Sequence, residues 1–395
     1  MLPALSHVEN AERGWKNHAT AIYSSTFAAL GLTFSILGPV LPTLAEQTHS
    51  SLTQISLLFI ARSVGSLVAS VGGGRMFDRL PGNLMVAIAM ALMIITGLLV
   101  PLIGSFWLLL FCLFLSGIAH GIMNVGGNVL LIWTHGKDVA PYMNALHFFF
   151  GVGTFFAPIL VAQVVLVTGS MTWAFWLVAL ITLPLLIYAL LVRSPKPQQQ
   201  PGVAREGKLD GWLVAGFCLI FAGYSGAGQA FSGWIFTYVT RLGLADATSA
   251  AYLNSVYWGA LMIGRLISIP LTVRFSPKAL LRADLIGALA SIGLITLFPH
   301  SLWVIGVGSA GFGFSLATIF PTSMSLASRH MLMTGKVTSY FAVGSSLGAL
   351  VLPWLVGQLF EPVGPETMVT LNFANIALTL LAFVLLSRRL SAAAS

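Results

Sequence analysis

Residues 84–103 read LMVAIAMALMIITGLLVPLI, a run of twenty positions without a charged side chain. About 20 apolar residues in a helix span the hydrocarbon core of a lipid bilayer. The whole chain has the same character, because 57% of its 395 residues are hydrophobic and only 8% are charged, against about 25% charged in a soluble protein. The composition excludes a water-soluble fold and predicts an all-α membrane protein that crosses the bilayer many times.

Eleven further apolar stretches of similar length occur along the chain. The twelve predicted membrane-spanning helices are residues 18–44, 52–75, 84–104, 106–133, 141–167, 171–192, 211–239, 249–272, 279–298, 302–328, 336–359 and 367–387. The longest polar stretch, residues 193–210, is too short to form a core of its own. Any chemistry must therefore take place among the helices.

The motifs of an enzyme are absent from the sequence. We find no nucleotide-binding loop, no residues at metal-ligand spacing and no nucleophile paired with a base. Cys112 and Cys218 both lie inside apolar stretches, where a thiol behaves as a small hydrophobic group. We therefore expect a protein that is not an enzyme and that holds neither a metal nor another cofactor.

Basic residues concentrate in alternate loops. Of the 19 Lys and Arg residues, sixteen fall on one side of the predicted helices, Arg241 falls on the other, and Arg62 and Arg265 lie within helices. Short basic loops resist translocation, so we predict that both termini are cytoplasmic and that the protein lies in the cytoplasmic (inner) membrane. Because these residues are scattered over many loops, the high isoelectric point does not indicate a nucleic-acid partner.

The chain is predicted to consist of two related halves. A shift of 195 residues aligns Gly38 with Gly233, Arg79 with Arg274, His135 with His330, Gly153 with Gly348, Pro158 with Pro353 and Gln163 with Gln358. The last three pairs reproduce the pattern G-x4-P-x4-Q in predicted helices 5 and 11. The predicted domains are a cytoplasmic segment 1–17, a six-helix half 18–192, a cytoplasmic linker 193–210, a six-helix half 211–387 and a cytoplasmic tail 388–395. Repeated halves that enclose a site at the membrane midplane are typical of secondary transporters.

The loop after predicted helix 2 reads GRMFDRLPGN, residues 74–83. It resembles the G-x3-D-R-x2-G-[RK] signature of the major facilitator superfamily at Gly74, Asp78, Arg79 and Gly82 and departs from it at Asn83. The glycines suit a tight turn, and Asp78 is placed to interact with a helix N-terminus of the other half as a latch, near residues 334–336. The alternative is that the loop carries two ordinary solvated charges.

Polar side chains form a stripe on predicted helix 4. His120, Asn124 and Asn128 are spaced i, i+4 and so share one helix face. Asn144 and His147 lie one turn apart in predicted helix 5, at a similar depth. Polar groups in the hydrocarbon core face partners or water, so these residues line either a solute cavity or hydrogen-bonded contacts between helices. The nearby glycines permit close helix packing.

The second half contributes further candidate solute-binding side chains in predicted helices 7 and 8. They are Gln229, Trp234, Tyr238, Asn254 and Trp258. The alternative for Trp234 and Tyr238 is that they lie at the membrane–water interface, where aromatic residues are common, and do not bind solute. Arg62 and Arg265 are candidate functional residues, because charges inside the membrane are rare and usually find a partner; their alternative is a structural pairing with helix carbonyls.

Four segments resemble a particular branch of the superfamily, the sodium-dependent glucose transporters, which are themselves similar to fucose:proton symporters. These segments are residues 124–129, 143–163, 234–239 and 255–270. The resemblance implies sugar uptake by alternating access, with the polar stripe near the solute. It also implies an acidic residue where this chain has Asn124, and another near Gly228 or Gln229.

None of the eleven carboxylates is predicted at the membrane midplane. Carboxylates in the membrane commonly relay protons, and sodium favours anionic oxygen ligands. The missing acids therefore indicate facilitated diffusion, with protonation of His120 or His147 as the alternative.

The sequence predicts a monomeric transporter of a small polar solute, in particular a monosaccharide. Amides bind sugar hydroxyls as donors and acceptors, and aromatic rings give a sugar ring a flat surface. The alternative is an exporter of drugs or lipid-like amphiphiles, with a wall formed by the phenylalanines at 148–150, 155 and 156. A membrane receptor or scaffold is a further alternative, which solute flux in liposomes would distinguish.

Overall fold

All regular elements in the described part of the chain are helices. The computed structural model describes residues 2–196 and 210–392. The elements of the first half are α1 (Leu2–Ser35), α2 (Leu37–Gln47), α3 (Leu52–Ile55), α4 (Leu57–Arg79), α5 (Gly82–Leu99), η1 (Val100–Leu102), α6 (Phe106–His135), η2 (Gly136–Asp138), α7 (Ala140–Thr168) and α8 (Thr172–Leu191). Those of the second half are α9 (Gly211–Arg241), α10 (Ala247–Arg274), α11 (Pro277–Leu297), α12 (Leu302–Leu316), α13 (Ile319–His330), α14 (Gly335–Val363) and α15 (Thr367–Ala392).

The prediction of a polytopic all-α membrane protein is confirmed. Among the described residues, eleven helices are long and apolar enough to cross a membrane, and the pair α1 and α2 makes a twelfth if it is one bent span. This pair bends by 45° at Ile36. Pro39 follows three residues later and has no N–H to donate to the preceding turn, so it begins a new helix there.

The tenth predicted span is also broken. Helix α12 ends at Leu316 and α13 begins at Ile319, with Pro321 in its first turn. The missing N–H of that proline accounts for the break in the same way. At the break, the hydroxyl of Thr318 donates a hydrogen bond to the carboxylate of Asp284 on α11.

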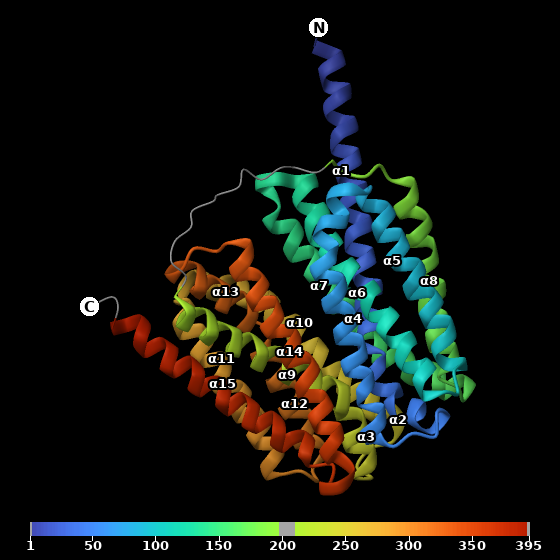
Figure 1. Ribbon diagram of the computed structural model, residues 1–395, viewed down its shortest axis with the longest axis vertical. Coiled ribbons are helices and arrows are strands. Elements are labelled where there is room, and N and C mark those ends of the chain that lie inside the picture. Colours follow the sequence, from blue (N-terminus) through green and yellow to red (C-terminus); the bar gives the residue numbers. More distant parts are fainter. Residues whose placement is uncertain (1, 197–209, 393–395) are drawn as a thin grey trace.

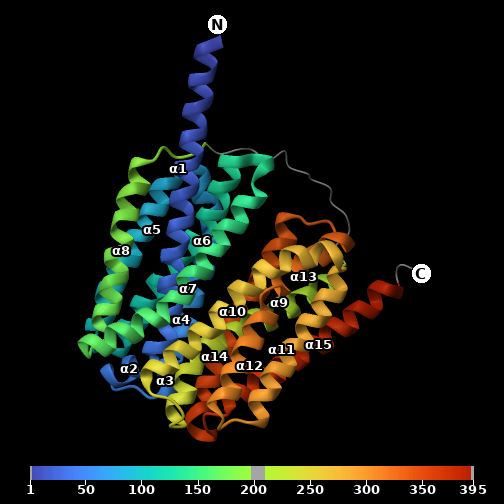
Figure 2. The ribbon, with the colours of Figure 1, turned by 180° about the vertical axis from the view of Figure 1, so that it is seen from behind.

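Two helical bundles make up the molecule, α1 to α8 and α9 to α15 (Figure 1). They lie together at the end where α14 leads into α15, here called the closed end, and diverge toward the end where α1 begins, the open end (Figure 2). Between them, α2 packs on α9, α3 and α4 pack on α14, and α7 packs on α10. The predicted linker 193–210 lies for the most part outside the described residues.

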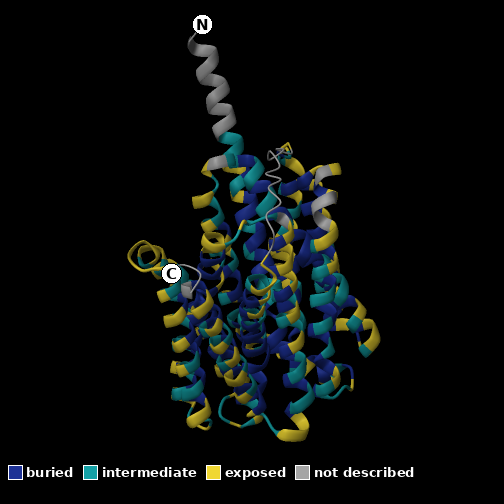
Figure 3. Ribbon diagram, turned by 60° about the vertical axis from the view of Figure 1, so that its left-hand side comes forward, coloured by how far each residue is buried: buried dark blue, intermediate teal, exposed yellow. Residues whose placement is uncertain are grey.

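Helix α5 shows how the apolar sequence is divided between the bundle interior and its outside. Leu84, Ile88 and Ile95 are exposed, whereas Met85 and Met93 are buried against neighbouring helices. Figure 3 shows the same division around the molecule, with buried residues inside and exposed ones on the outer faces. An exposed surface this apolar suits contact with lipid tails, as in a multi-pass membrane protein.

The aligned glycines occupy equivalent places in the two bundles. A β-carbon on Gly153 of α7 would overlap the backbone oxygen of Ala28 on α1, and one on Gly348 of α14 would overlap that of Ala222 on α9. Glycine at these positions therefore allows α1 and α7, and likewise α9 and α14, to pack backbone against backbone.

Candidate binding site between the two halves

A pocket of about 410 Å³ lies between the bundles. It is lined by Phe34 of α1, Arg62, Ser63 and Ser66 of α4, His120 of α6, Gln229 of α9, and Ser346 and Ala349 of α14. Three residues predicted from the sequence, Arg62, His120 and Gln229, thus meet at one pocket to which both halves contribute.

Arg62 is 7% exposed and is held against α1. Its Nη1 donates a hydrogen bond to the backbone oxygen of Phe34 at 2.9 Å, and its guanidinium carbon lies 4.7 Å from the centroid of the Phe34 ring. The sequence left open a structural role in which Arg62 pairs with a helix carbonyl, and the hydrogen bond to Phe34 is a contact of that kind. Gly117 of α6 permits this arrangement, because a β-carbon there would overlap the backbone oxygen of Arg62.

The ring of His120 is buried and both of its nitrogens have partners. Nδ1 lies 2.7 Å from the backbone oxygen of Ser116, and Nε2 lies 3.2 Å from Oγ1 of Thr33. A carbonyl oxygen can only accept, so Nδ1 carries the proton. In the neutral ring, Nε2 is therefore an acceptor that faces the hydroxyl of Thr33, and a second proton would place a cation beside Arg62.

The remaining predicted residues of the first half lie nearer the open end and outside the lining of this pocket. Asn124 and Asn144 are exposed, and Asn128 is half-buried with its amide donating to the backbone oxygen of Asn124 at 2.7 Å. His147 is exposed and its ring contacts that of Phe27 edge-on at a centroid distance of 6.0 Å. Arg265 of α10 lies within electrostatic range of His147.

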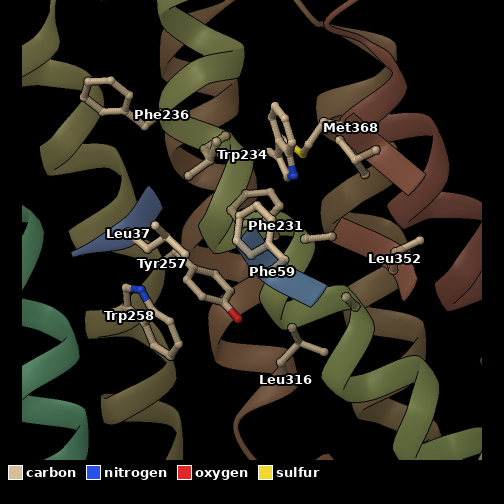
Figure 4. Close-up of a cluster of buried hydrophobic side chains, with 14 of the residues drawn as sticks. Leu37, Phe59, Phe231, Trp234, Phe236, Tyr257, Trp258, Leu316, Leu352 and Met368 are labelled. Carbon is tan, nitrogen blue, oxygen red and sulfur yellow. The ribbon is translucent and has the colours of Figure 1, made fainter. Parts of the chain in front are cut away.

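Three predicted residues of the second half are buried, and Figure 4 shows one of them, Trp234, among apolar side chains. Trp234 donates from Nε1 to the backbone oxygen of Pro353 at 2.9 Å, and Tyr238 donates to that of Pro299 at 3.2 Å. The amide of Asn254 donates to the backbone oxygen of Ser232 at 2.9 Å. In this conformation none of these side chains lines the pocket, and Trp234 also contacts Phe59 of the first half.

Trp258 lies at the boundary between the two halves. It is 6% exposed, its ring meets that of Phe34 edge-on at 6.0 Å, and its Nε1 has no hydrogen-bond partner among the described residues. An unpaired buried N–H costs about 1–3 kcal/mol, so this indole is a costly donor at the boundary, and its role in binding a solute stays a prediction.

Sequence reasoning missed five of the eight residues that line the pocket. Phe34, Ser63, Ser66, Ser346 and Ala349 were not among the predicted residues, although they line the same pocket as Arg62 and His120. Serine occurs throughout membrane helices, where it also bonds to its own helix. The available signal was the spacing of Ser63 and Ser66, which places both on one face of α4 beside Arg62.

The phenylalanines proposed as a wall for amphiphiles lie elsewhere. None of the residues 148–150, 155 and 156 lines the pocket. Phe149 and Phe156 are exposed on the surface of the bundle, and Phe155 packs over Gly259 of α10, where a β-carbon would lie 2.9 Å from its ring.

The predicted latch loop forms a tight turn. Helix α4 ends at Arg79, which is exposed, and α5 begins at Gly82, where a β-carbon would overlap the side chain of Leu130. The surroundings of Gly74 and of the Asp78 side chain are not among the described parts of the chain. The latch itself stays a prediction, and the two bundles diverge at this end (Figure 1).

The closed end is held by hydrogen bonds between α3 and α14, here called the Gln358 contact. The side chain of Gln358 donates to the backbone oxygen of Thr53 and to the hydroxyl of Ser56, both at 3.2 Å. The carboxylate of Glu361 accepts from the backbone N–H of Leu52 at 2.9 Å and from the hydroxyl of Thr53 at 3.3 Å.

A second hydrogen bond across the closed end joins α7 to α10. Gln163 donates to the hydroxyl of Tyr252, here called the Gln163 contact. Gln163 and Gln358 are equivalent in the repeat, so each half contributes one glutamine to the same seal. Phe59 of α4 adds an apolar contact, because its ring lies 6.1 Å from that of Trp234 (Figure 4).

Comparisons with known proteins agree with this architecture. Residues 23–353 match the family model described as Major Facilitator Superfamily. The sodium-dependent glucose transporter 1 of Homo sapiens is 27% identical over 373 residues, which cover 85% of this chain and 72% of the relative. The Xenopus laevis protein of the same name is 30% identical over 358 residues, with 83% and 73% covered.

Solved structures of two transporters show the same fold. The nucleoside transporter NupG superposes with a TM-score of 0.77 at 12% identity, covering 94% of this chain and 99% of that one. A bacterial homolog of the human lysosomal transporter Spinster, inward-facing and unoccupied, superposes with a TM-score of 0.67 at 14% identity, covering 94% and 95%.

Proposed function

The chain belongs to the major facilitator superfamily, and from that premise we propose that it carries a monosaccharide across the membrane through the pocket between its bundles. A secondary transporter of this superfamily is not an enzyme, so it works by binding its solute and changing conformation. The observation that carries the proposal is the pocket lining, in which hydroxyl, amide and imidazole groups surround the ring of Phe34. Sugar hydroxyls need both donors and acceptors, and a sugar ring packs well on an aromatic face. The relatives named as glucose transporters support the same solute class.

The proposed mechanism is alternating access. Because the basic loops lie on the cytoplasmic side, the open end faces the cytoplasmic side of the inner membrane. The Gln358 and Gln163 contacts then seal the outer side. Asn124, Asn128, Asn144 and His147 then line the path from the cytoplasm to the pocket. Opening of the outer side requires that the two contacts break while the bundles close at the other end. The transporter works as a monomer in this proposal, because one chain supplies both halves of the site.

Uptake by purified protein in liposomes tests this function directly. We expect labelled monosaccharides, presented as a panel, to enter liposomes that contain the protein faster than liposomes without it. Each sugar is tested with no gradient, with a proton gradient and with a sodium gradient. Transport of amphiphilic drugs without transport of any sugar would contradict the proposal, and uptake that needs sodium would contradict facilitated diffusion.

The Gln229→Ala variant tests the pocket itself. We expect it to weaken sugar binding about five- to 150-fold, because a sugar hydroxyl left unpaired in a buried site costs about 1–3 kcal/mol. Isothermal titration of the purified protein gives the dissociation constant. The control is Cys112→Ala, since Cys112 is buried within the first bundle outside this pocket and should bind sugar as the unmodified protein does. If the two variants bound the sugar with equal affinity, Gln229 would not be a sugar-binding residue.

The Asp78→Asn variant tests the predicted latch. We expect it to shift the population toward the inward-open state and to slow turnover roughly two- to fivefold, the effect of losing one charge at a helix end. Binding should persist. Thiol labelling of cysteines introduced along the cytoplasmic path measures the shift, and labelling rates unchanged by the substitution would show that Asp78 is not a latch.

A further inference from the structure

Among the described residues, no acidic side chain balances the charge of Arg62. The residue is 7% exposed, and one N–H group of its guanidinium donates to the backbone oxygen of Phe34. A guanidinium has five N–H donors, and no carboxylate of the described residues forms an ion pair with Arg62. Burying an unpaired charge is costly, and buried cations are normally paired with an anion.

The surroundings of Arg62 provide no other source of negative charge. Two pockets border it, the one between the bundles and one of about 550 Å³ inside the first bundle, and no Asp or Glu lines either. Asp284 of α11 accepts a hydrogen bond from Thr318 and lines neither of these pockets. Arg265, the other arginine within the spans, adds positive charge on the side of the open end.

The neighbours of Arg62 nevertheless have the groups that bind a sugar. Ser63 and Ser66 flank it on α4, and Gln229 and Ser346 face it from the second bundle. A monatomic anion carries no hydroxyl groups that could pair with the serines and the amide of this pocket. The anion that balances Arg62 is therefore better supplied by the solute itself, with its hydroxyls on the serines and the amide.

Resting on the proposed function, we propose that the solute is a sugar acid, such as a uronate or an aldonate, whose carboxylate binds the guanidinium of Arg62. Arginine binds carboxylates through two parallel N–H···O hydrogen bonds, a geometry that lysine cannot reproduce. The carboxylate provides the charge that the pocket lacks, and its sugar part satisfies the polar groups around it. Neutral hexoses of the same size would leave the guanidinium unpaired.

Binding of matched solutes to the unmodified protein tests this inference without any substitution. Glucuronate, its uncharged amide glucuronamide, and glucose differ in charge but hardly in size. We expect glucuronate to bind about ten- to a hundredfold more tightly than the other two, the range for one hydrogen-bonded charge pair. Affinity for glucose or glucuronamide equal to or above that for glucuronate would overturn the inference.

Substitutions at Arg62 locate the effect. In Arg62→Gln the ratio of glucuronate to glucose affinity should fall to about one, and in Arg62→Lys it should recover in part, because the charge remains and the paired geometry is lost. Arg274→Gln, at an exposed arginine outside the pocket, should keep the original ratio. A ratio that survives in Arg62→Gln would overturn the assignment to this residue.

Uptake in liposomes separates this inference from the proposed function. Transport of neutral sugars without transport of sugar acids overturns the inference and leaves the function standing. Glucose binding that requires chloride, and loses that requirement in Arg62→Gln, shows that the anion is chloride and overturns it as well. Failure to move any sugar, acidic or neutral, overturns the proposed function together with the inference.

Discussion

Cross-linking position 53 to position 358 is expected to abolish transport, and reduction is expected to restore it. In a protein with Cys112→Ala and Cys218→Ala, the substitutions Thr53→Cys and Gln358→Cys place two thiols where the Gln358 side chain now lies 3.2 Å from the backbone oxygen of Thr53. A short bifunctional thiol reagent with a cleavable disulfide then ties the first bundle to the second at the closed end. Alternating access requires these surfaces to separate, so a tied transporter binds solute from the open end and cannot release it on the other side.

A link within one bundle is the matched control. Ser225 and Ser345 join α9 to α14 through their hydroxyls, and both belong to the second half. If the halves move as rigid bodies, linking Ser225→Cys to Ser345→Cys should leave turnover close to that of the reduced form. Transport that continues through a complete link between 53 and 358 would contradict movement of the halves at this surface.

The second large effect is expected from adding one methyl group at Gly153 or Gly348. In either Gly→Ala variant the new β-carbon overlaps a backbone oxygen, of Ala28 or of Ala222, and backbone cannot move aside as a flexible side chain does. Overpacking of this kind destabilises by about 1–3 kcal/mol or more. We expect a lower melting temperature and less folded monomer, measured by thermal unfolding and by size-exclusion chromatography in detergent.

Gly72→Ala is the control for these variants. Gly72 lies in helix α4, and a β-carbon there has no atom within 4 Å. Alanine favours a helix over glycine by about 1 kcal/mol, so this variant should be at least as stable as the unmodified protein. If all three variants melt at the same temperature, the close contact of α1 with α7 and of α9 with α14 does not contribute to stability as described.

The fold could be predicted because hydropathy is a property of whole segments. The uncharged residues 84–103 became α5 and η1, and the pairing of Gly153 with Gly348 corresponds to equivalent helix contacts. The breaks at Ile36 and Thr318 were not predicted, because a window averaged over about 20 residues does not register a single missing N–H. Pro39 and Pro321 were the residues in the sequence that indicated the two breaks.

The site could be predicted only in part, for a different physical reason. A helix face follows from residue spacing, but which faces meet depends on how the bundles pack, and the sequence does not give that packing directly. Asn254 and Trp234 are polar residues in apolar helices, yet Nδ2 of Asn254 and Nε1 of Trp234 donate to backbone oxygens of their own bundle, and Oδ1 of Asn254 has no partner among the described residues. Arg62, His120 and Gln229 are polar in the same way but face the other half.

The repeated glutamines form two separate contacts at the closed end, and both must break before this end of the transporter opens. A carrier that is open on both sides at once becomes a pore, through which solutes and ions leak and the membrane loses its potential. If each contact is worth about 1 kcal/mol, one alone would be broken roughly one-sixth of the time, whereas two independent contacts would be broken together only about one-fortieth of the time. The repeat therefore supplies a second safeguard against leakage, and a variant that loses both Gln163 and Gln358 should leak roughly sixfold more than either single variant.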